Sequence, residues 1–329
     1  MNSNAIARRF VLAAISASAL AGVLSLHARA QSDFMRGDRM PYDAFERLQK
    51  IDIEVPGGVL HVGFAPGDIA LPQEKVLDWV RISAKAVATY YGRFPVTELK
   101  LLIVPVGGPR VRGGTTWGYR GAAIRVLLGR EASEDDLRRD WVMVHEMVHL
   151  ALPDMPDRYS WLSEGLAVYV EPIARVQAGD MTARDIWQAM MRDMPKGLPE
   201  AGDQGLDNTP TWGRRYWGGA MFCLLADIEI RKASKNRLGL RDAMRGVIAA
   251  GGTHEKNWPI ERVLTTADKA VGLDVMARLH REMGDKPVTP DLDRLWRDLG
   301  LRLRGEELEF DDKAPLAAIR EAITAPPAR

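Results

Sequence analysis

A run of apolar residues that contains two histidines and a glutamate constrains this chain more than any other feature. Residues 140–150 read DWVMVHEMVHL, with the histidines four positions apart. Upstream, Ser133 and the acidic residues after it provide a hydroxyl cap and favourable charges for the positive end of a helix dipole, and Pro153 ends any helix that reaches it. We therefore predict one helix over residues 133–152.

This helix would bring its polar side chains together. Positions four apart differ by about 40° around a helix axis, so His145 and His149 project from one face, one turn apart. Glu146 lies about 100° from His145, near enough to act beside the pair. The other residues of the segment are apolar and are expected to be buried: Trp141, Val142, Val144, Met147 and Val148. Two imidazoles and a carboxylate are costly to bury without partners, so either hydrogen bonds within the core or a bound cation must offset that cost.

A carboxylate further along the chain favours the cation. Glu164 stands in a second segment with helical periodicity, WLSEGLAVYVE at residues 161–171. A catalytic zinc site takes three protein ligands and leaves one position open, and two histidines with a glutamate complete such a set. The small residues Gly165 and Ala167 would let the two helices approach closely.

These segments together resemble the gluzincin metallopeptidases, in which a His-Glu-x-x-His helix is followed by a second helix that supplies a glutamate ligand. Within that group the sequence is most similar to the catalytic domain of the glycyl aminopeptidase family, and more distantly similar to aminopeptidase N. The resemblance implies one zinc ion per chain, held by His145, His149 and Glu164, with Glu146 as the general base that activates water. It also implies hydrolysis of peptide bonds in peptide or protein substrates, and a thermolysin-like two-lobe α+β architecture.

Two further residues fall on positions of interest. Tyr216, in the segment RYWGGAMFCLLADIEIR at residues 215–231, matches the family tyrosine whose hydroxyl stabilises the tetrahedral oxyanion. A tyrosine packed at a loop edge is the alternative. Glu171 lies seven residues after Glu164, on the same helix face, where a carboxylate opposes the helix dipole. It either supports a ligand imidazole through a hydrogen bond or is solvated.

A glycine-rich segment upstream resembles the part of these enzymes that holds the substrate. Residues 112–129, RGGTTWGYRGAAIRVLLG, match a glycine motif followed by an edge strand along which the peptide lies. The resemblance implies substrate contacts from four residues of the motif: Gly113, Gly114, Thr115 and Thr116. It also implies an edge strand at residues 122–128 that pairs with an extended peptide.

The chain departs from the family pattern in two places. Many of these enzymes carry a glutamate in the glycine motif that binds the free amine of the substrate, and here Thr115, Thr116 and Trp117 stand instead. The family's lysine next to the tyrosine is also replaced, because Gly218 and Gly219 follow Trp217. The resemblance therefore does not extend to the amine preference of an aminopeptidase.

The predicted secondary structure changes from mainly strands to mainly helices partway along the chain. Between residues 51 and 128, short β-type runs alternate with glycines and prolines, and one amphipathic helix is predicted at residues 73–91. After residue 134 almost every segment has helical periodicity. We predict three parts of the exported chain: an N-terminal mixed-sheet part at residues 31–132, a helical zinc-binding and C-terminal lobe at residues 133–310, and a short tail at residues 311–329. The turn-rich stretch 197–214 is expected to be either functional or disordered.

The first thirty residues have the pattern of a signal peptide. Arg8 and Arg9 precede an uncharged stretch at residues 10–26, and a small-x-small motif ends at Ala30. We predict cleavage after Ala30 and export, to the periplasm or otherwise to the outer medium, and retention as a membrane anchor is the alternative. No later run is long and apolar enough to cross a membrane.

Composition excludes other classes of protein. Without the three arginines of the signal, 45 basic residues become 42 against 44 acidic ones, so the exported chain carries a net charge of about −2 and nothing in it points to nucleic acid. Cys223 is the only cysteine and lies among apolar residues. This excludes an internal disulfide and favours an inert buried thiol over a nucleophile.

Two rival interpretations of the histidine pair stay open at this point. A pseudo-peptidase would keep zinc or the peptide groove and only bind peptides or proteins, which the altered amine-binding motif favours. The second rival is a different zinc hydrolase or a purely structural metal site, and a structural site would be closed by four protein ligands. His254 or His280 would have to supply the fourth ligand, because no cysteine lies near the pair.

Overall fold

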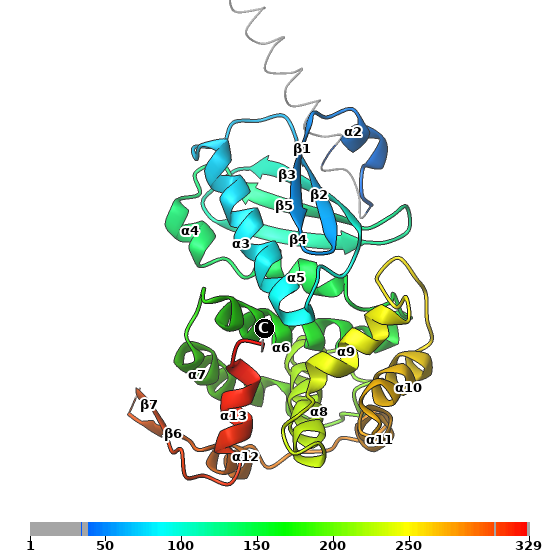
Figure 1. The fold of residues 1–329 in the computed structure, drawn as a ribbon, viewed down its shortest axis with the longest axis vertical. Helices are drawn as coiled ribbons and strands as arrows, with labels where there is room; N and C mark the ends of the chain where they lie inside the picture. The colour runs from blue at the N-terminus through cyan, green and yellow to red at the C-terminus, as the bar shows by residue number, and fades with distance from the viewer. Residues whose placement is uncertain (1–33, 35–38, 306, 328–329) are drawn as a thin grey trace, which may run out of the picture.

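The computed structural model describes residue 34 and residues 39–305 and 307–327, so the predicted signal peptide lies outside the described residues. A mixed sheet occupies the upper part of the molecule in Figure 1, and the helices that follow residue 160 occupy the lower part. Within the described residues, no helix combines the length and the apolar character that crossing a membrane requires.

Five strands form the sheet. They are β1 Lys50–Val55, β2 Gly58–Phe64, β3 Glu98–Val106, β4 Val111–Trp117 and β5 Ala123–Gly129. Their order is β1-β2-β3-β5-β4, with β2, β3 and β5 parallel and the outer strands antiparallel to their neighbours. The prediction of an edge strand at residues 122–128 is wrong, because that segment is β5 and lies between β3 and β4. The glycine-rich motif itself forms the edge strand, β4.

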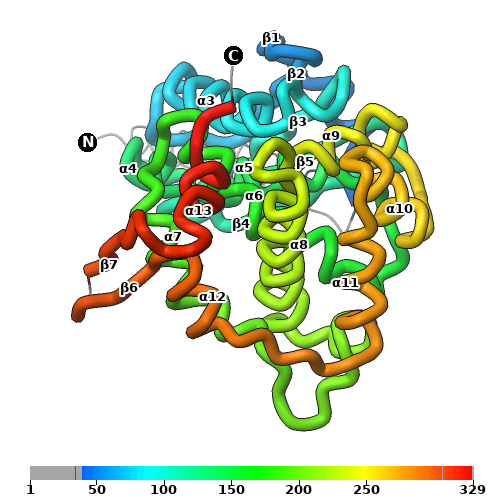
Figure 2. The backbone as a smooth tube through the Cα atoms, turned by 60° about the horizontal axis from the view of Figure 1, so that its bottom comes forward, coloured from blue at the N-terminus to red at the C-terminus, as the bar shows by residue number. Residues whose placement is uncertain are grey.

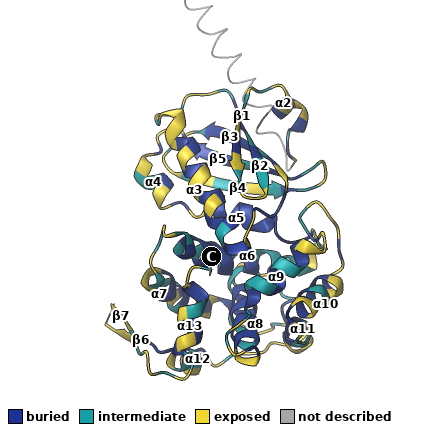
Figure 3. Cartoon of the chain, in the orientation of Figure 1, coloured by how far each residue is buried: buried dark blue, intermediate teal, exposed yellow. Residues whose placement is uncertain are grey.

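Both faces of the sheet are covered. Helix α3, Gln73–Tyr91, matches the predicted amphipathic helix and links the parallel strands β2 and β3 by crossing over one face. The short helix α2, Tyr42–Glu46, packs on the other face. Alternation along β3 serves both layers, because Leu101 and Ile103 join the main core while Leu102 and Val104 join the smaller one. Strand β3 is accordingly almost wholly buried in Figure 3.

The rest of the described chain is mainly helical, as predicted. The helices are α4 Glu134–Arg138, α5 Val142–His149, α6 Ser160–Ala178, α7 Ala183–Asp193, α8 Gly219–Ala233, α9 Leu240–Ala249, α10 Ile260–Val271, α11 Met276–Met283, α12 Leu292–Leu299 and α13 Ala317–Thr324. One hydrophobic cluster continues from the sheet through α3, α5 and α6 into α8 and the helices after it, so sheet and helices share a core. A small ribbon, β6 Leu301–Arg304 with β7 Glu307–Phe310, interrupts the region predicted to be helical.

The C-terminal tail is packed. Figure 2 shows α13 in red close to α6, and the side-chain amide of Gln177 on α6 donates a 2.9 Å hydrogen bond to the carbonyl of Ile323. Ile319 and Ile323 are buried in the main core. Helix α13 within the predicted tail therefore packs against the helical part.

The helix predicted over residues 133–152 is divided in two. Ser133 does cap a helix start, accepting from the Asp136 amide at 3.1 Å, but α4 ends at Arg138. Asp140 then accepts from the amides of Val142 and Met143, at 3.1 and 3.0 Å, and starts α5. An aspartate side chain competes with the helical hydrogen bonds in this way, which explains the break.

The ends of α5 also differ from the prediction. Trp141 is 50% exposed instead of buried, because it stands just outside the new helix start. The helix ends at His149 and not at Leu152. The shortening leaves both histidines on α5, so the feature on which the prediction rested is preserved.

The turn-rich stretch 197–214 is held by buried polar contacts. Arg214 Nε lies 2.8 Å from Asp203 Oδ2, with both side chains almost fully buried. Asp207 accepts a 2.8 Å hydrogen bond from the indole of Trp161 on α6, and its second oxygen lies 2.9 Å from His280 Nε2. These contacts fasten the stretch to the helical core.

The cap at Asp140 predicts a stability effect. Replacing Asp140 by Ala leaves two amides of α5 without their acceptor, and we expect a loss of about 1–2 kcal/mol of unfolding free energy, measured by denaturant titration. Asp140→Asn keeps an acceptor and should retain most of the stability. Asp78→Ala, which removes an exposed carboxylate on α3, serves as the control and should stay within about 0.5 kcal/mol of the parent. Equal stability of Asp140→Ala and the control would contradict the assignment.

Candidate metal centre

Two helices bring three potential metal ligands to one point. His145 and His149 project from α5, and Glu164 projects from the first turns of α6. Glu164 Oε2 lies 3.1 Å from His145 Nε2 and 3.6 Å from His149 Nε2. One ligand atom from each residue lies within 4.8 Å of the other two. The side chains that the sequence singled out as a set are thus gathered at one place.

The spacing of these atoms suits a zinc ion. Tetrahedral zinc with bonds of about 2.0–2.1 Å separates its ligand atoms by roughly 3.3 Å, which is close to both measured separations. Two imidazole nitrogens and one carboxylate oxygen are also a common donor set for catalytic zinc. Within the described residues no fourth side chain belongs to this group. His254 lies close by without joining it, and His280 is bound to Asp207.

Burial shapes the electrostatics of the three ligands. Burial and the neighbouring His145 lower the pKa of His149 to about 3, so its imidazole is neutral and able to donate a lone pair. Burial opposes ionisation of Glu164, but its hydrogen bond with His145 and its electrostatic interactions with both histidines hold the pKa of Glu164 below its usual value. A neutral His149 imidazole beside an ionised Glu164 carboxylate suits the binding of a metal cation.

The outer nitrogens of the two imidazoles have different surroundings. His149 Nδ1 lies 2.9 Å from Ser163 Oγ, which fixes the ring. His145 Nδ1 is buried and makes no hydrogen bond to the described residues. Glu171 is buried and forms a 3.0 Å ion pair with Arg175 one turn further on, so it is not solvated. Its support of a ligand imidazole stays a prediction, and sequence reasoning missed Ser163 although it directly precedes Glu164.

Glu146 is buried at the bottom of the same site. Thr116 Oγ1 donates to Glu146 Oε2 at 2.6 Å, and the Thr116 hydroxyl also lies 3.0 Å from the Glu146 carbonyl oxygen. Gly114 of β4 passes so close that a Cβ there would lie 2.4 Å from Glu146 Cγ, which only glycine permits. Burial raises the pKa of Glu146, while His145 and Thr116 oppose that shift. A carboxylate held in place with a raised pKa suits proton transfer near neutral pH.

Tyr216 stands beside the ligands. It lies in the π-helix Arg214–Gly218 that leads into α8, and its ring is parallel to that of His145, with ring centroids 6.3 Å apart. Burial, together with the carboxylate of Glu164, raises the pKa of Tyr216 to about 12. Its hydroxyl therefore keeps its proton at neutral pH and can donate it. Single turns of π-helix often occur at functional sites. The sequence pattern did not predict this π-helix.

A cleft of about 490 Å³ opens onto these residues. Its lining comes from β4, α5, α6, the π-helix and the loop that carries His254: Val111, Arg112, Gly113, Gly114, Thr115, Thr116, Trp141, Val142, His145, Glu146, His149, Ser163, Glu164, Tyr216 and His254. All four residues predicted to contact substrate are among them. The hydroxyl of Thr116 is engaged with Glu146, however, and that of Thr115 donates to the Gly114 carbonyl.

The small residue after Glu164 has a different partner from the one predicted. Gly165 lies against Gly219 at the start of α8, where a Cβ on Gly165 would be 2.1 Å from a backbone atom of Gly219. At Gly165 the close approach therefore joins α6 to α8. The contact places α8 and the tyrosine ahead of it next to the ligand helix.

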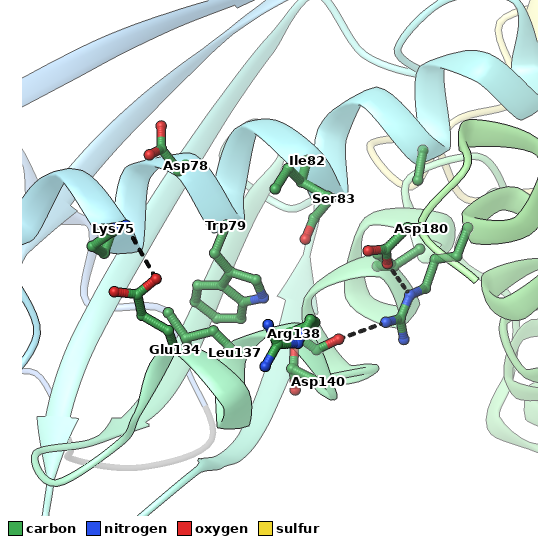
Figure 4. Close-up of a pocket in the computed structure, with 13 residues that line it drawn as sticks. Lys75, Asp78, Trp79, Ile82, Ser83, Glu134, Leu137, Arg138, Asp140 and Asp180 are labelled. Atoms are coloured by element: carbon green, nitrogen blue, oxygen red, sulfur yellow. Dashed lines mark hydrogen bonds and ion pairs between the residues drawn. The ribbon is translucent and has the colours of Figure 1, made fainter.

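A second cavity of about 310 Å³ lies on another face of α5, between α3, α4 and α6 (Figure 4). Its charged side chains are paired: Lys75 with Glu134, Asp78 with Arg81, Arg138 with Asp135 and Arg175 with Asp180. Both carboxylate oxygens of Asp140 accept hydrogen bonds from amides at the start of α5. The reactive groups thus gather in the first cleft. Cys223 is buried with a raised pKa, as expected of an inert thiol.

Comparison with known proteins gives likeness in fold only. No family model matches the chain, and no curated protein matches it in sequence. An aminopeptidase N family protein from Idiomarina loihiensis matches with a TM-score of 0.58 and 14% identity, over 78% of this chain and 50% of that one. An M1 zinc metallopeptidase from Deinococcus radiodurans matches with a TM-score of 0.48 and 17% identity, over 74% and 53%.

The chain therefore spans about half the length of the solved structures that it resembles. The first match shows that the fold is that of a protein of the aminopeptidase N family, which confirms the more distant of the two resemblances found in the sequence. The nearer resemblance, to the glycyl aminopeptidase family, stays a prediction. The fold is of mixed α and β class, as predicted.

Proposed function

We propose that the protein is a zinc-dependent metallopeptidase that hydrolyses peptide bonds. One observation carries the proposal: ligand atoms of His145, His149 and Glu164 converge within 4.8 Å in a cleft that also holds Glu146 and Tyr216. The fold of an aminopeptidase N family protein supports it. Peptides or proteins are the proposed substrates.

The residues of the cleft divide the chemistry among them. His145, His149 and Glu164 would hold the ion, whose Lewis acidity polarises the scissile carbonyl and makes a water molecule more acidic. Glu146 takes the proton of the attacking water and passes it to the leaving amine. Tyr216 donates its hydroxyl proton in a hydrogen bond to the oxyanion.

Neighbouring hydroxyls keep these groups in position. The 2.6 Å bond from Thr116 orients the Glu146 carboxylate, and the Ser163 hydroxyl, 2.9 Å from Nδ1, fixes the His149 ring. Holding a general base at hydrogen-bonding distance from a defined point lowers the entropic cost of reaching the transition state. Glu171 is proposed to support a ligand imidazole from the α6 side.

The finer architecture is part of the proposal. The sheet part at residues 31–132 and the helical part at residues 133–310 would correspond to the two lobes of a thermolysin-like gluzincin, with the metal between them and residues 311–329 as a tail. The position of α5 between the sheet and the later helices in Figure 1 supports this division. Export through a signal at residues 1–30, to the periplasm or the outer medium, is proposed from the sequence pattern alone.

Metal binding is the first test. We expect one zinc per chain by elemental analysis, and a melting temperature that falls on chelation and recovers when zinc is restored, because an ion that binds only the folded state stabilises it. His149→Ala and Glu164→Ala should each remove most of the bound zinc. His61→Gln, at a half-buried position of β2 outside the cleft, is the matched control and should bind zinc like the parent. Full zinc occupancy in both ligand variants would rule out this site.

Removal of the general base is the second test. Glu146→Gln keeps the size of the side chain and an acceptor for Thr116 but cannot take a proton, so we expect peptide cleavage to fall by roughly 10²–10⁴-fold with zinc content unchanged. Cleavage of a mixed peptide pool, followed by mass spectrometry, measures this. Equal and negligible cleavage by both proteins would favour a protein that only binds peptides.

The oxyanion role of Tyr216 gives a third prediction. Tyr216→Phe removes only the hydroxyl, and we expect kcat to fall by roughly 10²-fold with little change in KM, because the hydrogen bond strengthens in the transition state. Tyr159→Phe, at a tyrosine outside the cleft, should leave kcat unchanged. A purely structural Tyr216 would show itself as a stability loss in the phenylalanine variant with normal kcat.

A further inference from the structure

We propose that Arg112 is a specificity-determining residue, which makes the cleft select peptides that carry a carboxylate near the scissile bond over peptides that present a free ammonium there. A role of Arg112 near a scissile bond rests on the proposed peptidase function. It extends that function to the class of peptide that the site accepts.

Arg112 is placed at the cleft by an irregularity in the edge strand. The pairing of β4 with β5 shifts register between Val111 and Gly113, so Arg112 is the extra residue of a β-bulge. Gly113 has a φ of 155°, which falls in the region that favours glycine. Bulges redirect side chains and are frequent next to active sites. Arg112 is exposed and lines the cleft, with Nη1 next to Gly108 in the turn between β3 and β4.

The guanidinium of Arg112 has no partner among the described residues. It makes no ion pair or hydrogen bond to any described residue, whereas two other arginines of the same strands and turns are paired. Arg110 lies 3.7 Å from Asp136, and Arg120 lies 3.0 Å from Asp43. A cation that lines a cleft without a partner is available to an anionic group of the substrate.

Both carboxylates that line the cleft already have interaction partners. Among the described residues that line it, only Glu146 and Glu164 are acidic. Glu164 belongs to the metal group, and Glu146 is buried and bonded to Thr116. With a divalent cation bound, the two glutamates would neutralise the ion and Arg112 would leave an excess positive charge. A free ammonium therefore has no partner in the cleft and is repelled, while a carboxylate is attracted.

The geometry also indicates where the carboxylate would lie. Gly114 touches Glu146, so the β4 position at Gly114 marks the reacting bond. Arg112 precedes it by two residues. A regular strand would rise about 7 Å over two residues, and this is an upper limit here because Arg112 forms the bulge. A peptide lying along edge strand β4 would thus bring an acidic group to Arg112 about two residues from the scissile bond, on the side of the β3–β4 turn. The group is either an aspartate or glutamate side chain or the terminal carboxylate.

Binding measurements test the proposal independently of turnover. Zinc-loaded Glu146→Gln protein is titrated by calorimetry with acetylated, amidated heptapeptides that carry Glu or Gln at each position in turn. We expect the Glu peptide to bind about fivefold more tightly than its Gln partner at one position near the centre. Adding Arg112→Gln should reduce that ratio below about twofold, and Arg112→Lys should keep part of it. A second peptide series with free C-terminal carboxylates at successive lengths distinguishes the terminal group from a side chain.

The control and the opposing outcomes are equally specific. Arg110→Gln removes a nearby cation that faces Asp136, and should leave the Glu preference intact. Persistence of the preference in Arg112→Gln, tighter binding of peptides with a free N-terminus than of acetylated ones, or no binding of any peptide would each overturn the proposal. Cleavage of the same peptides by the parent protein tests the proposed function separately, because selective binding without cleavage would refute catalysis and leave the role of Arg112 standing.

Discussion

The structure depends on one electrostatic problem: four titratable side chains meet in a place almost closed to water. His145, Glu146 and His149 are all less than a tenth exposed, and Glu164 reaches them from the neighbouring helix. Burying such groups without partners costs several kcal/mol each. The imidazole nitrogens and the carboxylate oxygen lie close together, so a divalent cation there would satisfy all three side chains at once. Glu146 is stabilised differently, by the hydroxyl of Thr116.

Glycines lie at the points where backbone segments approach Glu146 and helix α6 most closely. Gly114 lets edge strand β4 pass directly over Glu146, and the contact of Gly165 with Gly219 lets α8 run against the ligand helix α6. The same α8 begins after the π-helix that holds Tyr216 next to His145. Sheet, ligand helices and α8 are therefore closely packed around the cleft that holds Glu146, Glu164 and Tyr216.

The charged side chains of the cleft differ from those of the second cavity in how they are paired. Near the second cavity, behind α5, the acidic and basic groups compensate one another within the protein. In the first cleft the acids are occupied and Arg112 remains without a partner among the described residues. The departure from the amine-binding motif of the family thus coincides with a cation at the same strand. The proposed peptidase function, with the proposed selectivity for a carboxylate, would account for both observations.

Local sequence was sufficient for α3 and for the residue types at the candidate metal centre. Apolar periodicity located α3 and placed the β-type runs within residues 51–128, and the four-residue spacing placed His145 and His149 on one helix face, because these patterns depend only on the repeat of helix and strand. Other features needed the tertiary structure. The break at Asp140 arose from a side chain competing for amides, and the edge position of β4 arose from pairing between distant segments. The hold of Thr116 on Glu146, the partner of Gly165 and the unpaired state of Arg112 are likewise set by residues far away in sequence. Spacing along a chain determines which side chains share a face, and only packing decides what that face meets.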